Sequence, residues 1–268
     1  MRPSLGHLAF LCSAVSFVAV WWEVAARVAD PEQVASPLSV GRALLGLFTD
    51  QSLRGQMVAG LASTLGAVLL AFLLAAAVGV PLGLLMGRYR LADMFLDPWL
   101  KAWYSIPAIA LVPLAMNWAG LTWAGATLTG FLLAFFSVAM SVYAGAREVG
   151  SQTVEPALSL GASHLQLISK VILPASLPNI MVALRLGVSR AIEGVVIAEM
   201  TFSVVGLGGL LDPAADRLHL AQSTALVLVL AVVSVSLTSL MKWVNRKAVP
   251  WKEAQAIVGD GTRPMVEA

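Results

Sequence analysis

Long apolar stretches alternate with short polar connections along almost the whole chain, and this alternation predicts the fold. Each stretch has roughly the 20 residues that an α-helix needs to cross the hydrocarbon core of a bilayer. The stretches lie at about residues 8–28, 57–87, 100–118, 121–143, 179–205 and 221–243. The pattern therefore predicts an all-α, polytopic membrane protein with about six transmembrane helices.

The composition agrees with a membrane protein. Of the 268 residues, 59% are hydrophobic and only 12% are charged, whereas soluble domains have about 25% charged residues. Cys12 is the only cysteine, which excludes a disulfide within the chain and a metal site built on cysteines. The formal net charge of +2 does not identify a class of partner.

The first apolar stretch allows two interpretations. Arg2 stands before the apolar run and Ala25–Ala26 near its end, as in a signal peptide with its cleavage site. The run is longer than the roughly 7–15 residues of such a peptide, which favours a retained helix. Residues 30–56 form a mixed connection that contains prolines and charges and cannot span a membrane, with a short surface helix expected around residues 39–48. They complete a predicted N-terminal part, residues 1–56.

The second stretch carries small residues at every fourth position. They are Ala71, Ala75, Gly79, Gly83 and Gly87. A stripe of this kind lets another helix approach closely. We expect it to serve packing within the subunit rather than a dimer contact.

The third stretch contains two prolines six residues apart, Pro107 and Pro113. We expect them to interrupt the helix and to free backbone carbonyls. Within a membrane this is tolerated only where protein or a water-filled cavity supplies partners. Both prolines are therefore candidates for the lining of a translocation path, and kinked packing is the alternative.

The fifth stretch bears an unusual number of charges for a membrane helix. An ionisable group near the bilayer centre costs about 2.5–3.5 kcal/mol on insertion scales, so it must face protein or water. Arg190 and Glu193 are three residues apart and can form an ion pair on one helix face. Together with Glu199 they are candidates for the translocation path. A structural ion-pair network between helices is the alternative.

A polar segment between the fourth and fifth stretches, Glu155–Pro174, predicts a bent element outside the membrane. Thr153 is the expected N-cap of a first short helix, with Pro156 in its first turn. Gly161 tolerates the positive φ at which helices commonly end. The segment is thus expected to turn at Gly161.

A second short helix is expected after this turn. Ser163 is its predicted N-cap, and Pro174 its end, because the residue before a proline is pushed out of the helical region. Its expected apolar face consists of Leu165, Ile168 and Ile172. A compact bent element between two spans is suited to contact a partner.

This segment resembles the EAA loop of the membrane subunits of bacterial ABC importers, E-A-A-(three)-G-(nine)-I-x-L-P. The positions that fall on this spacing are Glu155, Ala157, Gly161, Val171, Leu173 and Pro174. Pro156 replaces the second alanine and Val171 the isoleucine, and neither change removes the bend. Motifs from Val80-Pro81-Leu82-Gly83 to Gly206-Leu207-Gly208 narrow the resemblance to nitrate/sulfonate/taurine-type permeases.

The resemblance implies a type I ABC importer transmembrane fold in which the bent segment is a cytoplasmic coupling helix. The transmembrane core is then residues 57–245, with the coupling loop at 145–178 and a cytoplasmic tail at 246–268. The resemblance assigns the coupling to the ATPase to five residues: Glu155, Ala157, Leu158, Gly161 and Leu165.

The resemblance also implies the partners and the mechanism. Two copies of the chain form a homodimer, two ABC ATPase subunits hold ATP and magnesium, and a periplasmic or lipid-anchored binding protein delivers the solute. The chain itself needs no cofactor. The expected substrate is a small solute such as nitrate, a sulfonate or taurine, moved by ATP-driven alternating access.

Basic residues set the expected orientation, since they favour the cytoplasmic side of a membrane. The densest group lies between Lys242 and Lys252. We expect the chain to lie in a bacterial inner membrane. With six spans, both of its termini are expected on the cytoplasmic side.

The sequence carries no recognisable catalytic motif. It contains no G-x-x-x-x-G-K-[ST] phosphate loop, so we expect ATP hydrolysis in a partner, and no H-E-x-x-H or G-x-S-x-G pattern. Two alternatives stay open. One is a secondary transporter or channel without an ATPase, which would usually show inverted repeats. The other is a membrane scaffold or enzyme.

Overall fold

The computed structural model describes residues 5–28, 34–149, 151–202, 204–211 and 220–250, and every regular element within these ranges is a helix. Four helices are long and apolar enough to cross a membrane: Gln51–Arg88, Trp123–Arg147, Leu167–Thr201 and Leu220–Ala248. A bent pair of helices adds a fifth candidate. The prediction of an all-α polytopic protein is confirmed, whereas the count of six spans stays a prediction.

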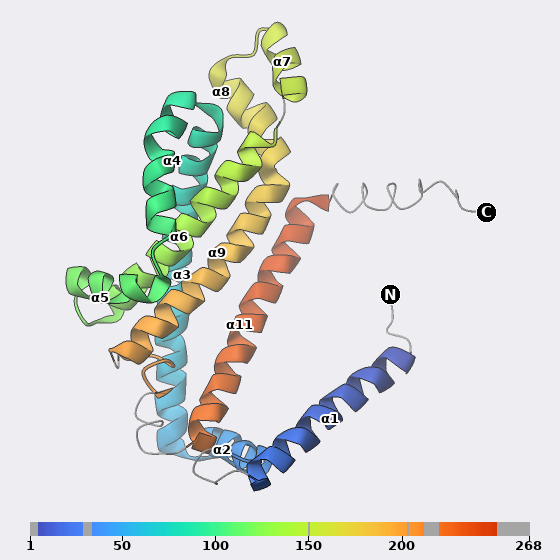
Figure 1. Cartoon of the computed structure of the whole chain (residues 1–268), viewed down its shortest axis with the longest axis vertical. Helices are drawn as coiled ribbons and strands as arrows, with labels where there is room; N and C mark the ends of the chain where they lie inside the picture. The colour runs from blue at the N-terminus through green and yellow to red at the C-terminus, as the bar shows by residue number, and fades with distance from the viewer. Residues whose placement is uncertain (1–4, 29–33, 150, 203, 212–219, 251–268) are drawn as a thin grey trace. The chain divides into compact units, whose positions relative to one another are not determined.

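The chain divides into two compact units. The first comprises Met1–Ser63 and Glu199–Val232 and contains α1 (Leu5–Val28) and α2 (Pro37–Thr49) (Figure 1). The indole nitrogen of Trp22 in α1 donates to the carbonyl of Ala35 at 3.0 Å, just before α2. Apolar side chains form the core of this unit: Val40, Leu47, Met57, Leu207, Leu211, Ala225 and Leu226.

Helix α2 matches the short helix expected around residues 39–48. The hydroxyl of Ser36 accepts the N–H of Ser39 at 3.2 Å and caps the helix. Pro37 occupies its first turn, where the missing N–H has no intrahelical partner. Cap and proline together explain why the helix begins here.

Helix α3 (Gln51–Arg88) begins at Gln51 rather than at Met57, where hydropathy placed the start of the second span. The reason is Asp50, whose carboxylate accepts the N–H groups of Ser52 at 2.8 Å and Leu53 at 3.3 Å. These hydrogen bonds, the one from Leu53 first, lower the pKa of the Asp50 carboxyl below its ordinary value. A polar cap thus extends the helix beyond its apolar part.

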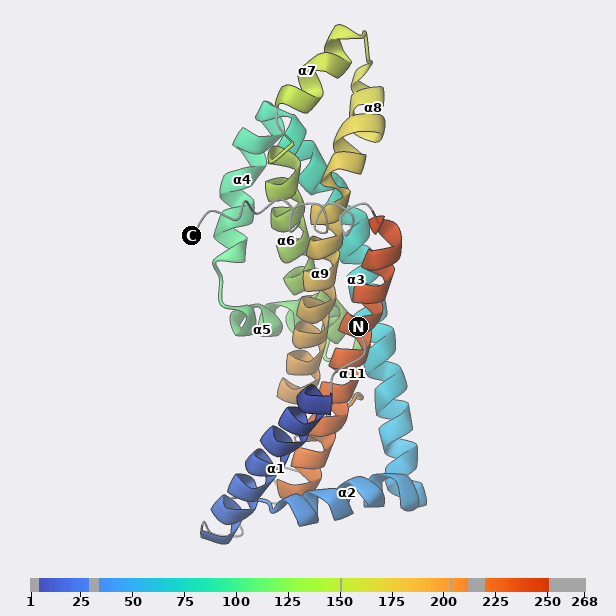
Figure 2. The ribbon, with the colours of Figure 1, turned by 90° about the vertical axis from the view of Figure 1, so that its right-hand side faces the viewer.

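The second unit comprises Thr64–Ala198 and Val233–Ala268. It holds all or part of α3, α4 (Arg90–Tyr104), α5 (Ala108–Ala119), α6 (Trp123–Arg147), α7 (Ser151–Ser159), α8 (His164–Gln166), the π-helix η1 (Leu167–Ile172), α9 (Leu173–Thr201) and α11 (Leu220–Ala248). In α6, 67% of the most apolar window is buried, against 17% to 33% in the other three long spans. Figures 1 and 2 show α6 between α4 and α9, so it is the central helix of this unit.

The small-residue stripe of α3 faces α6 of the same chain. A Cβ added at Gly83 would lie 2.7 Å from the carbonyl oxygen of Ala139 and 2.8 Å from the Cβ of Val142. At Gly79 it would lie 3.1 Å from the side chain of Val138. The expected packing role within the subunit is therefore confirmed.

The interruption of the third apolar stretch that the sequence predicts at Pro107 is confirmed. Helix α4 already begins at Arg90, and α4 and α5 meet at 101° across residues 105–107. Pro107 causes the break, because it pushes Ile106 out of the helical region and has no N–H to continue the helix. The expected interruption at Pro113 is wrong, because Pro113 lies inside α5, which continues through it.

The expected end of the second short helix at Pro174 is wrong. The chain stays helical from His164 through η1 into α9 without interruption. In an α-helix the ring of Pro174 would clash with the carbonyl four residues earlier. The wider π-helical turns of η1 directly before it change the position of that carbonyl and relieve the clash.

Candidate functional site

The polar segment between α6 and α9 folds into a bent element, as the sequence predicts. Helix α7 ends in a Schellman motif, in which Gly161 N–H donates to the Leu158 carbonyl at 2.9 Å and Ala162 N–H to the Ala157 carbonyl at 3.1 Å. Gly161 has a φ of +79°, which glycine adopts without steric cost. The prediction that Gly161 ends the first helix is confirmed.

The start of this helix differs from the expectation. Helix α7 begins at Ser151, so Thr153 lies inside it rather than at the N-cap, and Pro156 lies beyond its first turn. The proline is tolerated because it removes only the hydrogen bond to the carbonyl of residue 152, near the start of the helix. The last turn keeps its hydrogen bonds through the Schellman motif.

Ser163 begins the second helix, as predicted. Its N–H donates to Oε1 of Gln166 at 3.0 Å, and the Gln166 N–H donates back to the Ser163 hydroxyl at 3.4 Å, which is a capping box. The expected apolar face of Leu165, Ile168 and Ile172 is not formed. Leu167 and Ile172 are buried but Leu165 is exposed, because π-helical winding changes the angular spacing of the side chains.

Three leucines near the turn are exposed. The exposed fractions are 43% for Leu158, 89% for Leu160 and 80% for Leu165. Helix α7 packs against η1, and Figures 1 and 2 show α7 and α8 at one end of the second unit. Sequence reasoning missed Leu160, although an apolar residue directly before a helix-ending glycine was a usable signal. The bent element thus exposes three large apolar side chains near its turn.

The other two coupling candidates lie on α7. Glu155 is exposed and Ala157 is half-buried. The carbonyl of Glu155 accepts the hydroxyl of Ser159 at 3.0 Å. All five coupling candidates therefore belong to α7, the turn or the start of the second helix.

The base of the bent element is closed by a polar contact between α6 and α9. The Asn179 side-chain amide donates to Oε2 of Glu148 at 2.9 Å across 31 residues of chain. Gly145 permits this approach, because a Cβ there would overlap the side chain of Asn179. This hydrogen bond thus joins the two chain ends of the segment from α7 to η1.

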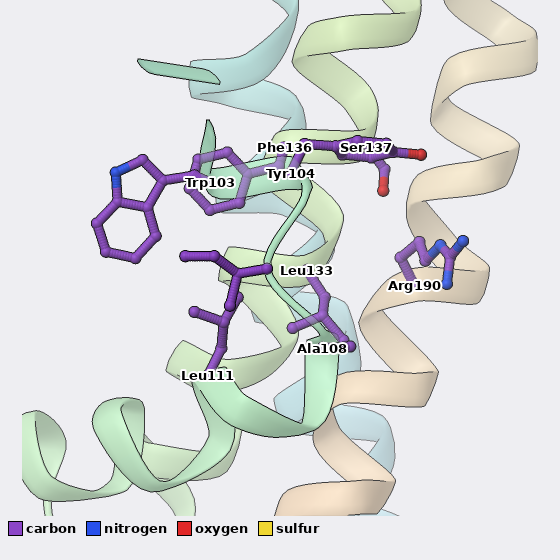
Figure 3. A pocket seen from close by; sticks show the side chains of 9 residues that line it. Trp103, Tyr104, Ala108, Leu111, Leu133, Phe136, Ser137 and Arg190 are labelled. Carbon is purple, nitrogen blue, oxygen red and sulfur yellow. The ribbon is translucent and has the colours of Figure 1, made fainter. Parts of the chain in front are cut away.

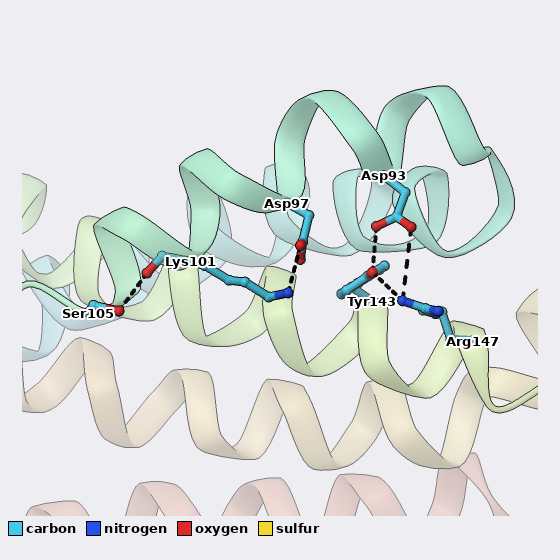
Figure 4. Close-up of polar contacts among 6 residues, drawn as sticks. All are labelled: Asp93, Asp97, Lys101, Ser105, Tyr143 and Arg147. Atoms are coloured by element: carbon cyan, nitrogen blue, oxygen red, sulfur yellow. Dashed lines mark hydrogen bonds and ion pairs between the residues drawn. The ribbon is translucent and has the colours of Figure 1, made fainter.

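A second set of contacts joins the end of α6 to α4 (Figure 4). The Tyr143 hydroxyl donates to Oδ1 of Asp93 at 2.5 Å, and Arg147 donates to the Tyr143 oxygen at 2.7 Å. Further along α4, Lys101 donates to Asp97 at 2.6 Å. Because Arg147 is the last residue of α6 and α7 follows shortly after it, these contacts connect α4 to the base of the bent element.

A cavity of about 230 Å³ is lined by residues of α4, α5, α6 and α9 and of the bend between α4 and α5 (Figure 3). Its lining is mostly aromatic and aliphatic, and Trp103 stacks on Phe136 with ring centroids 5.9 Å apart. Arg190 is the one charged residue of this lining. The cavity thus combines an apolar wall with a cation.

Arg190 and Glu193 form the ion pair that their spacing predicts. Arg190 Nη1 donates to Glu193 Oε2 at 2.7 Å, and each side chain is 39% exposed. Neither Pro107 nor Pro113 lines the cavity, but Ile106 and Ala108 on either side of Pro107 do. Pro107 therefore shapes the cavity through the bend.

Glu199 belongs to the first unit and is completely buried. Its Oε2 accepts the N–H of Gly208 at 3.0 Å, and Gly206 lies against the same carboxylate. The carbonyl of Val205 accepts the hydroxyl of Ser63 at 2.7 Å. Glu199 supports the loop at residues 204–211, and its place on a solute path stays a prediction. Among the described residues, no group of three His, Cys, Asp or Glu side chains could hold a metal ion.

Residues 79–250 match the family of binding-protein-dependent transport system inner membrane components. The taurine transport system permease protein TauC of Escherichia coli K12 is 31% identical over 250 residues, which are 92% of this chain and 89% of that protein. The putative aliphatic sulfonates transport permease protein SsuC of Bacillus subtilis 168 is 29% identical over 254 residues, 94% of this chain and 91% of that protein.

Solved structures show the same fold. The inward-facing MetNI methionine ABC transporter aligns with a TM-score of 0.65 at 19% identity, over 75% of this chain and 99% of the chain compared. This confirms the predicted fold of an ABC importer membrane subunit.

Members of the matched family are multi-pass inner-membrane permease subunits of ABC importers. They are transporter subunits rather than enzymes, because ATP hydrolysis resides in a separate subunit and a binding protein supplies the solute. Since the match covers well over half of its length, this chain belongs to the family of binding-protein-dependent transport system inner membrane components.

Proposed function

We propose that this permease subunit imports a small organic anion and that the segment from α7 to η1 couples the transport to the ATPase. The observation that carries the proposal is the apolar surface of Leu158, Leu160 and Leu165 on a bent, firmly capped element. Exposed apolar surface gains about 25 cal/mol per Å² when a partner covers it. The ATPase is the partner that this surface fits.

The turn geometry supports a rigid element that transmits force. The Schellman motif at Gly161 and the capping box at Ser163 fix the angle between the two short helices. The Glu148–Asn179 contact fixes their base. Glu155 and Ala157 border the apolar surface and complete the proposed contact with the ATPase.

The proposed assembly is a homodimer of this chain with two ATPase subunits, which hold ATP and magnesium, and a periplasmic or lipid-anchored binding protein. Both termini lie in the cytoplasm. The permease core is residues 57–245 with its coupling loop at 145–178, and residues 246–268 form the cytoplasmic tail. The match over residues 79–250 supports this core.

The proposed substrate class is a small sulfonate or a related small anion. Relatives that carry the names of a taurine permease and a putative aliphatic sulfonates permease support this class. Arg190 and Glu193 border the proposed path, and Pro107 shapes the bend beside it. Pro113 and Glu199 are further proposed residues of the path. A cation beside an apolar cavity suits a solute of this kind.

The test replaces exposed leucines in the complex of permease, ATPase and binding protein in proteoliposomes. Leu160→Asp and Leu165→Asp place a charge in the proposed contact, and we expect both to abolish ATP-driven solute uptake and to weaken copurification of the ATPase. Leu160→Met and Leu165→Met keep the apolar surface and should retain most of the uptake. Normal ATP-driven uptake by both Asp variants would rule out this contact.

A further inference from the structure

We infer that the cavity beside Arg190 is a binding subsite for a small organic anion, and that Glu193 is the carboxylate that this anion displaces. The inference rests on the proposed function. It adds which residues hold the anion and how the site releases it.

The charge of the cavity supports an anionic ligand. Arg190 is the one charged residue of its lining. In the described part of the chain its guanidinium makes one hydrogen bond, to Glu193 at 2.7 Å. A guanidinium carries five N–H donors in a planar fork, so further donors can meet the oxygens of a sulfonate or carboxylate.

Arg190 lies well inside α9, far from both of its ends. At about 1.5 Å per residue, roughly 26 Å of helix separate it from Leu173 and roughly 16 Å from Thr201. An ionisable side chain inside a membrane span faces protein or a water-filled space rather than lipid, and it commonly marks a substrate pathway. Arg190 is one of the residues that line the cavity.

The other walls suit the organic part of such a ligand. Trp103 and Phe136 stack with their rings only 4° from parallel and form a flat apolar wall. Figure 3 shows the hydroxyl groups of Tyr104 and Ser137 on the side of the cavity where Arg190 lies. The volume of about 230 Å³ is below the roughly 300–1,000 Å³ of drug-sized pockets. The ligand therefore has only a few carbon atoms.

Glu193 makes the binding reversible. It follows Arg190 by three residues on the same helix face and is 39% exposed. When the anion enters, its oxygens replace the Glu193 carboxylate on the guanidinium. When the carboxylate returns, the anion is released. Transport needs binding strong enough to load and weak enough to release, and the ion pair supplies the competing partner for the guanidinium.

The test measures binding of ethanesulfonate to the permease–ATPase complex in lipid nanodiscs by equilibrium dialysis. Ethyl methyl sulfone, a neutral probe of similar size, should not bind. Arg190→Gln should weaken ethanesulfonate binding about tenfold or more, which corresponds to about 1.4 kcal/mol. Glu193→Gln should tighten it about three- to tenfold, because the competing carboxylate is gone, and should slow ATP-driven uptake because release is slower.

Arg185→Gln is the matched control, since it removes a cation from the same helix outside the cavity lining, and it should leave the affinity unchanged. A purely structural ion pair predicts lower melting temperatures for Arg190→Gln and Glu193→Gln with no change in affinity. That outcome, or no binding by the wild type, overturns the inference.

The same measurements separate this inference from the proposed function. If the wild type binds ethanesulfonate but shows no ATP-driven uptake with its ATPase and binding protein, the proposed function fails and the subsite stands. If uptake is ATP-driven and the affinities do not change in the variants, only the subsite fails.

Discussion

The Tyr143 hydroxyl donates to Asp93 at 2.5 Å and accepts from Arg147 at 2.7 Å, so one side chain of α6 joins α4 to the base of the bent segment from α7 to η1. Nη1 of Arg147 also lies 3.9 Å from Oδ2 of Asp93, but the side chains of Arg147 and Asp93 are 59% and 28% exposed. Exposed ion pairs contribute about 0–1 kcal/mol, whereas hydrogen bonds to charged groups contribute about 1.5–3 kcal/mol. The hydroxyl is therefore the main polar link between α4 and α6.

Tyr143→Phe should destabilise the permease by about 1.5–3 kcal/mol, because it leaves the Asp93 carboxylate without its best donor. Unfolding in mixed micelles measures this effect. Solute uptake per ATP hydrolysed should also fall, since α4 connects the base of the proposed coupling segment to the cavity. Tyr89→Phe removes an exposed hydroxyl and should stay within about 0.5 kcal/mol of the wild type. Equal stability of the two variants would show that the link contributes nothing.

Substitutions of Gly161 separate the effect of shape from the effect of charge at the proposed coupling surface. A Cβ at this position meets no atom of the chain within 4 Å, and its φ of +79° is tolerated better by Asn and Asp than by other side chains. Gly161→Asn should therefore retain most of the substrate-stimulated ATP hydrolysis. Gly161→Asp has nearly the same shape but adds a charge, and it should abolish the stimulation while the permease dimer still forms.

Measuring ATP turnover with and without loaded binding protein tests this pair of variants. Gly161→Ala is a third variant, which strains the turn without adding a charge, because a left-handed backbone costs alanine about 1–2 kcal/mol. If Gly161→Asn and Gly161→Asp show equal stimulation of ATP hydrolysis, charge at this position plays no part in coupling.

Local signals were predictable from the sequence. The turn at Gly161, the cap at Ser163 and the pairing of Arg190 with Glu193 each depend on residues within a few positions of one another. The packing role of the glycine stripe in α3 followed from its period of four. The predictions of these features are confirmed because local backbone geometry alone brings the residues together.

Features that depend on distant partners were not predictable. Tyr143 and Asp93 are 50 residues apart, and no periodicity links them. The role of Pro174 was misjudged because a π-helical turn, which has no simple sequence signal, accommodates its ring. The 101° bend at Pro107 exceeds the kink that a proline alone predicts.

Asp50 predicts a pH dependence at the start of α3. Its pKa in the folded protein is lowered by the N–H groups of Leu53 and Ser52, so its stabilising effect is fully present above the unfolded pKa of about 3.9. The effect is lost as the pH falls through the lower folded value. Amide hydrogen-exchange protection of Ser52 and Leu53 should therefore persist at pH 5 and decline below about pH 4.

Asp50→Asn provides the control for this titration. Its side-chain oxygen still accepts the two N–H groups but does not titrate, so protection corrected for intrinsic exchange should not change between pH 5 and pH 3. A decline of equal size in both proteins would mean that another group is responsible.

The loop at residues 204–211 has no room for a side chain at Gly206 beside Glu199. An alanine Cβ at Gly206 would overlap the buried Glu199 carboxylate, which must then give up the N–H of Gly208. Loss of a hydrogen bond by a buried charged group costs about 1–3 kcal/mol, so Gly206→Ala should lower the melting temperature in detergent. Gly46→Ala, in open space within α2, should be neutral or stabilising by up to about 1 kcal/mol.

A double-mutant cycle identifies the cause of this loss. Glu199→Ala removes the carboxylate that the new methyl group meets, so Gly206→Ala should cost clearly less in that background than in the wild type. Neighbouring residues that share a contact commonly show interaction energies of about 0.5–3 kcal/mol. Strict additivity would contradict the overlap and would assign the effect of Gly206→Ala to the close approach of Gly60 to the same loop.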